Sequence, residues 1–82
     1  MASLLQFHHP GAPPSLADVL AIFGLDPDDV DAEFGVVATD PQAGIFTVRI
    51  EDHALDKARV ALTARPRHPA EGLFGDPRIE PL

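Results

Sequence analysis

Residues Phe34–Glu51, FGVVATDPQAGIFTVRIE, decide the fold predicted for this chain. The pattern changes to a period of two in 34–39, and in 45–51 the apolar Phe46, Val48 and Ile50 alternate with Thr47, Arg49 and Glu51. A period of two is typical of a β-strand with one buried face. Between the two runs, 40–44 reads Asp-Pro-Gln-Ala-Gly, where proline presets a turn and glycine can take the positive φ that closes it. The stretch therefore predicts a β-hairpin that pairs 34–39 with 45–51. Its second strand is one-sided, so we expect helices on one face of the sheet and water on the other.

Ahead of the hairpin, the sequence predicts one helix and one short strand. Ser15 is a suitable N-cap, and Gly24 is a suitable stop. Apolar residues recur between them at helical spacing, which predicts a helix over 16–23. Residues 3–9 can form a strand, which the prolines of 10–14 end.

Two further helices are expected, one on each side of the hairpin. Asp26, followed by proline, has the order of a helix start and predicts a short helix over 27–33. Asp52 can cap a third helix over 53–64, which has a narrow apolar stripe. The fold class is therefore α+β: a small antiparallel sheet with the three helices on one face.

After residue 64 the periodic pattern stops. Residues 65–82, RPRHPAEGLFGDPRIEPL, contain four prolines and two glycines. Proline is excluded from helix interiors and central strands, so we expect an irregular, extended C-terminal arm that gains order only by docking. The predicted organisation is a single α+β domain over 1–64 followed by this proline-rich arm.

Length and charge exclude several classes of protein. A chain of 82 residues makes one domain, and its lack of cysteine rules out disulfides and thiol chemistry. Its net charge of −7 repels nucleic acid and anionic membranes, and no apolar run is long enough to span a bilayer. We expect a soluble cytoplasmic protein, although a domain cut from a longer secreted precursor would show the same features. The abundance of Ala, Pro, Asp and Arg resembles that of proteins from high-GC bacteria.

No group of residues has the spacing of a catalytic, cofactor or metal site. The acidic run 26–33 lacks the Gly and Glu that an EF-hand loop needs at its sixth and twelfth positions, and helix capping explains its aspartates. The four histidines lack zinc-ligand spacing, and His53 and Asp56 are expected to form only a solvated pair. Neither serine suits a catalytic triad, and no glycine-rich phosphate loop occurs. We therefore predict no enzyme activity, no cofactor and no metal.

The arm is the strongest candidate for a binding segment. Its apolar side chains sit on a proline-stiffened extended backbone, which loses little entropy when it docks in a groove. The alternative is that these side chains fold back and cover the core of their own domain. The candidate partner-binding residues are Leu73, Phe74, Arg78, Ile79, Glu80, Pro81 and Leu82.

Three stretches carry a resemblance to a known family: 5–11 (LQFHHPG), 44–50 (GIFTVRI) and 76–80 (DPRIE). With the order strand, helix, hairpin, helix and terminal segment, the chain resembles the propeptides and stand-alone propeptide-like inhibitors of subtilisin-type serine proteases. The resemblance implies a ferredoxin-like βαββαβ domain that packs on the protease. It also implies that Ile79, Glu80, Pro81 and Leu82 occupy the active-site cleft.

From these observations we expect a non-catalytic protein-binding module whose extended C-terminal tail docks on a protein partner. A propeptide-like serine protease inhibitor is the narrower form of this hypothesis. The alternative is a small accessory or structural subunit that stabilises a larger enzyme or multiprotein assembly.

Overall fold

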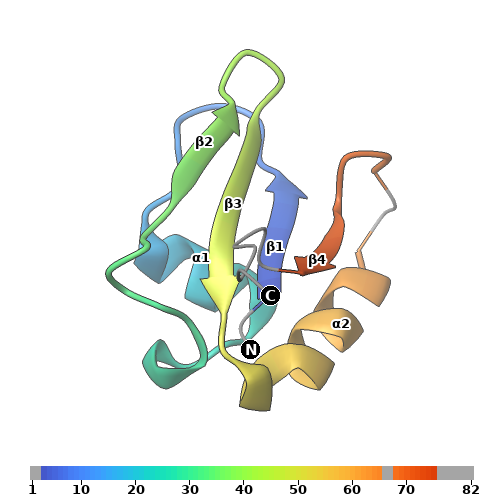
Figure 1. Ribbon diagram of the computed structural model, residues 1–82. Helices are drawn as coiled ribbons and strands as arrows, with labels where there is room; N and C mark the ends of the chain where they lie inside the picture. The colour runs from blue at the N-terminus through green and yellow to red at the C-terminus, as the bar shows by residue number, and fades with distance from the viewer. Residues whose placement is uncertain (1–2, 66–67, 76–82) are drawn as a thin grey trace, which may run out of the picture.

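The computed structural model describes residues 3–65 and 68–75 and confirms the α+β class (Figure 1). Four strands and two α-helices follow one another as β1 (Ser3–His8), α1 (Leu16–Phe23), β2 (Val37–Asp40), β3 (Ile45–Ile50), α2 (Leu55–Thr63) and β4 (Gly72–Gly75). Two single 3-10 turns, η1 (Pro27–Asp29) and η2 (Asp52–Ala54), complete the described elements. No helix in these two ranges is long and apolar enough to cross a membrane.

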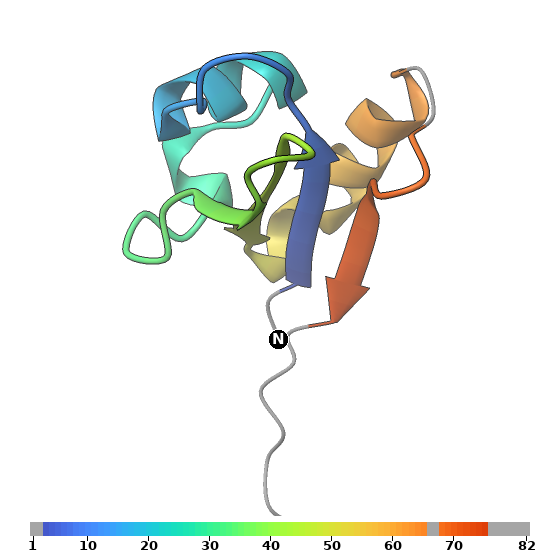
Figure 2. The same ribbon diagram turned by 90° about the horizontal axis from the view of Figure 1, so that it is seen from above.

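The four strands form one antiparallel sheet in the order β2-β3-β1-β4. Helix α1 connects β1 to β2, and α2 connects β3 to β4, so each β-α-β unit is split by a strand of the other unit. Figure 2 shows both helices on the same side of the sheet, as the one-sided hairpin strand predicts. No helix within residues 3–65 and 68–75 lies over the opposite face.

The core lies between the sheet and the two helices. Leu5 and Phe7 of β1 are completely buried, and they pair in register with Val48 and Phe46 of β3. The Phe7 ring meets the Phe23 ring of α1 edge-on, with 5.3 Å between centroids. Alternation along the strands places these apolar side chains on the helix-covered face.

Helix α1 confirms the prediction for 16–23. The Ser15 hydroxyl accepts a hydrogen bond from the Asp18 amide at 3.1 Å, and the Asp18 carboxylate accepts one from the Ser15 amide at 3.0 Å. This capping box satisfies two amides at the start of the helix. Gly24 ends the helix in the left-handed conformation with φ of 64°, which glycine adopts without steric cost.

The short helix predicted over 27–33 does not form. Only the 3-10 turn η1 is present, because the backbone is extended again at Val30 and runs beside the end of β3. The Asp31 amide donates to the Arg49 carbonyl at 2.9 Å, and the Glu51 amide donates to the Asp29 carbonyl at 2.9 Å. These long-range hydrogen bonds replace those that a longer helix would have made.

The other boundaries shift by a few residues, and one strand is added. The first hairpin strand is β2 (Val37–Asp40), and α2 starts after η2. Gly72–Gly75, predicted as part of an irregular arm, pairs with β1 as β4. Pro69 and Pro77 flank this stretch without entering it, and an edge strand needs hydrogen bonds on one side only.

Replacing Phe7 by alanine is expected to destabilise the protein by about 3–5 kcal/mol, because removal of a fully buried ring leaves a cavity. Val60, which is 69% exposed on α2, provides a control whose change to alanine should alter stability by less than about 0.5 kcal/mol. Urea unfolding followed by circular dichroism measures both. Equal stability of the two variants would contradict the described core.

Candidate functional site

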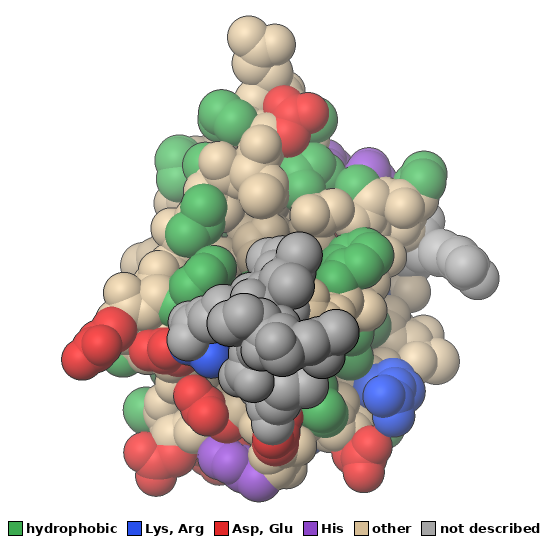
Figure 3. Space-filling model, viewed as in Figure 1, with side chains coloured by type: hydrophobic (Ala, Val, Ile, Leu, Met, Phe, Trp, Pro, Cys, Tyr) green, Lys and Arg blue, Asp and Glu red, His purple; other side chains and the backbone are tan. Residues whose placement is uncertain are grey.

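The face of the sheet without helices carries an uncharged hollow of about 240 Å³ that spans all four strands. We call this surface the open face and define it by the residues that line the hollow: Leu4, Gln6, Phe34, Val37, Thr39, Thr47, Phe74 and Gly75. Figure 3 looks onto this side of the molecule, where most of the visible acidic side chains gather in the lower half and hydrophobic side chains lie along the left and to the right of the centre.

Polar groups on the open face already have partners within the protein. The Thr39 and Thr47 hydroxyls lie 3.1 Å apart, and the Thr39 hydroxyl also donates to the Ile45 carbonyl at 3.2 Å. The Gln6 side-chain amide donates to the Ala70 carbonyl at 2.7 Å. With these groups satisfied internally, the open face offers mainly shape and apolar area to a ligand.

Leu73 and Phe74 were predicted to bind a partner together, but they point to opposite faces of the sheet. Phe74 is 51% exposed and borders the open face, whereas Leu73 is opposite Leu5 and packs against the core. Neighbouring residues of a strand always diverge in this way. Of the predicted set, Arg78, Ile79, Glu80, Pro81 and Leu82 lie outside the described residues.

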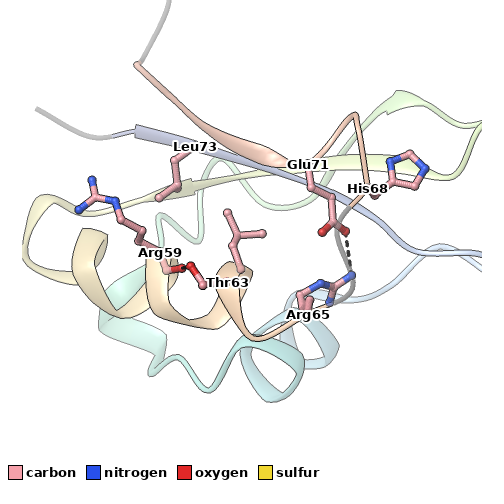
Figure 4. A pocket seen from close by; sticks show the side chains of 7 residues that line it. Arg59, Thr63, Arg65, His68, Glu71 and Leu73 are labelled. Carbon is pink, nitrogen blue, oxygen red and sulfur yellow. Dashed lines mark hydrogen bonds and ion pairs between the residues drawn. The ribbon is translucent and has the colours of Figure 1, made fainter.

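A second hollow, of about 480 Å³, lies between α2 and the strand β4 (Figure 4). We call it the α2–β4 pocket. In Figure 4 the Leu73 side chain points from β4 toward α2, and Thr63 lies on the helix below it. The lining residues are Arg59, Leu62, Thr63, Arg65, His68, Glu71 and Leu73.

One end of the α2–β4 pocket is closed by a largely buried ion pair. Glu71 accepts hydrogen bonds from the Arg65 guanidinium at 2.9 Å and from the His8 amide at 2.8 Å. The same guanidinium donates to the His8 carbonyl at 3.1 Å and lies 4.8 Å above the Phe23 ring. The His68 ring stacks on the His8 ring with centroids 4.4 Å apart. These contacts hold the segment before β4 against β1.

A further polar cluster, around Asp29 and Lys57, joins η1 to α2. The Asp29 carboxylate, with 6% of its side chain exposed, accepts hydrogen bonds from the Lys57 ammonium at 2.6 Å and from the Asp26 amide at 2.8 Å. The Lys57 hydrogen bond, followed by the Asp26 amide, lowers the pKa of Asp29 to about 2. The same hydrogen bond raises the pKa of Lys57 above its ordinary value.

The predicted solvated pair of His53 and Asp56 is wrong. The His53 Nε2 atom lies 3.0 Å from the Asp29 carboxylate, and Asp56 pairs with Arg59 instead. Asp26 is an N-cap as predicted, although of the 3-10 turn η1 and not of a longer helix, and it forms a capping box with Asp29. The ion pair between Asp29 and Lys57, which are far apart in the sequence, was not predicted, because it depends on how η1 and α2 pack. Within 3–65 and 68–75, no three His, Asp or Glu side chains are placed to hold a metal ion.

Comparisons of this chain with protein-family models, curated proteins and solved structures found no match.

The depressed pKa of Asp29 predicts a specific loss of stability in acid. A carboxylate that ionises more readily in the folded protein stabilises it above the unfolded pKa of about 3.9, and this contribution is lost as pH falls toward 2. Asp29→Asn should therefore flatten the fall in unfolding free energy between about pH 4 and pH 2. Asp28→Asn, at an exposed neighbouring position, should leave it unchanged. Identical pH profiles for wild type and Asp29→Asn, measured by urea unfolding, would contradict this account.

Proposed function

We propose that this chain is a non-catalytic protein-binding module, and that a folded partner protein docks on the open face. The observation that carries this proposal is the uncharged hollow over all four strands, on the face that none of the described helices covers. The partner's contacting surface is apolar, because the residues lining the hollow bear no charge that could pair with an ion.

Two exposed hydrophobic side chains support a protein partner. Val37 is 41% exposed on β2, and Phe74 is 51% exposed on β4. Aromatic side chains near the centre of an interface often contribute a large part of the binding energy. Phe74, on the edge strand β4, offers an aromatic side chain at the margin of the hollow. Phosphate-bearing ligands fit poorly, because the chain has a net charge of −7 and the hollow offers no cation.

The narrower form of the proposal is an inhibitor of subtilisin-type serine proteases. It is supported by the sequence resemblance and by the βαββαβ order with strand order β2-β3-β1-β4, which is the ferredoxin-like arrangement that the resemblance implies. Gly75, the last described residue, borders the open face. The described part of the chain therefore ends beside the proposed docking surface. In this form Ile79, Glu80, Pro81 and Leu82 enter the active-site cleft.

Inhibition assays with the full 82-residue chain test the inhibitor form directly. We expect the chain to slow peptide hydrolysis by one or more members of a panel of subtilisin-type proteases. Phe74→Asp should weaken inhibition at least about tenfold, equivalent to about 1.4 kcal/mol, because it puts a charge on the docking surface. Val60→Asp adds the same charge at an exposed apolar position on α2 and should change nothing.

Deletion of 76–82 separates the two roles considered for the arm. If the segment binds a protease, its removal should weaken inhibition at least about tenfold and leave the melting temperature unchanged. If it covers the core of its own domain, its removal should lower the melting temperature markedly by exposing apolar area again. A failure of the intact chain to inhibit any protease of the panel would discard the inhibitor form.

The accessory-subunit form of the proposal predicts that a different partner protein docks on the open face of this chain. A photo-crosslinking amino acid at Val37 should give one discrete adduct in the native host, while the same group at Val60 should not. The crosslinked protein, once purified, should bind wild-type chain and bind Phe74→Asp at least about tenfold more weakly. Equal crosslinking from both positions, or equal binding of both proteins, would contradict docking on the open face.

A further inference from the structure

We propose that the outer edge of β4 and the α2–β4 pocket together bind an extended acidic peptide. The peptide adds to the sheet as a fifth strand beside β4. One apolar side chain of the peptide occupies the pocket, and a carboxylate two residues away pairs with Arg59. The site shares β4 with the margin of the open face, but it uses the outer edge of that strand and the side that faces α2. The inference does not require a partner on the open face.

The two edges of the sheet are not equivalent. The β2 edge is irregular, since its register with β3 shifts between Ala38 and Asp40, and it ends in a charged side chain. Bulges and charges are the usual means by which proteins block unwanted strand addition. The β4 edge has neither. Its sequence, Gly-Leu-Phe-Gly, contains no charge and no proline, and its register with β1 runs without a shift.

The α2–β4 pocket lies between α2 and this edge strand, and Leu62 and Leu73 are the apolar side chains among the residues that line it. Leu73 points from β4 toward α2 (Figure 4), and Leu62 of α2 also lines the pocket and packs against the core. A volume of about 480 Å³ falls in the range of roughly 300–1,000 Å³ that is typical of ligand pockets. In strand addition, main-chain hydrogen bonds supply affinity and pockets for alternate side chains supply specificity. The β4 edge can provide the main-chain hydrogen bonds, and the α2–β4 pocket can provide the site for a side chain.

The positive charge of Arg59 favours an acidic residue as the second peptide side chain that contacts the site. The Arg59 side chain is 66% exposed, and that of Asp56, which pairs with it at 3.1 Å, is 95% exposed. Such a solvated pair contributes little stability, so the guanidinium can exchange Asp56 for a carboxylate of a ligand. Arg65, in contrast, is held by Glu71 and the His8 carbonyl. Side chains two apart on a strand point to the same face, which places the acidic residue of the peptide two positions from the apolar one.

A titration of the isotopically labelled full chain with acetyl-Thr-Leu-Thr-Glu-Thr-amide tests the proposal. Amide chemical-shift changes should concentrate in β4 and along α2. The peptide with Lys in place of Glu should bind at least about tenfold more weakly to wild type. The Arg59→Glu variant should reverse this preference. Because Arg59 is largely exposed, the variant should keep the wild-type melting temperature, which serves as the folding control.

N-methylation of the peptide tests for strand addition as opposed to adsorption in the pocket. Only alternate amides of an added strand face β4, so methylation of one set of peptide amides should abolish binding and methylation of the other set should be tolerated. The proposal is overturned by shift changes that avoid Gly72–Gly75, by tolerance of both methylation patterns, or by a Glu preference that survives Arg59→Glu. It is also overturned if the free chain forms a dimer through β4, since the edge would then be occupied by a second copy.

Discussion

Leu5 and Phe7 point from β1 into the space between the sheet and the helices, and neither side chain is exposed to water. Because β1 lies between β3 and β4, the burial of these two side chains requires the hairpin on one side, β4 on the other, and helical cover above. Alternation along β1 then directs Leu4 and Gln6 to the opposite face. The open face is thus a direct consequence of how the core is built.

Features encoded by neighbouring residues were predictable. The Ser15 and Asp18 capping box, the Gly24 stop and the one-sided alternation of 45–51 each depend on side chains within a few positions. Features that depend on distant partners were not. The predicted helix over 27–33 competed with hydrogen bonds to β3, and those hydrogen bonds exist only after the sheet has formed. Strand β4 is only four residues long, and its pairing with β1 spans most of the chain.

In the candidate site, too, features set by neighbouring residues were predictable and features set by distant residues were not. Phe74 could be recognised in the sequence as an apolar residue in a proline-rich context, and the structure leaves it exposed beside the open face. Leu73 carried the same signal, yet strand alternation turns it toward the core. Most of the open face could not be inferred from the sequence, because Phe34, Val37 and Thr47 come together with β1 and β4 only through the strand register. The α2–β4 pocket likewise requires a helix and an edge strand to pack side by side.

Docking on the open face requires that this face is accessible to a partner in the free protein. Paramagnetic relaxation of side-chain methyl groups by a soluble probe measures this directly. We predict that the methyl groups of Val37 on the open face relax strongly, between those of the more exposed Val60 and those of buried Val48, which are protected. Val37 protected to the same degree as Val48 would show that the face is already covered and would contradict the account.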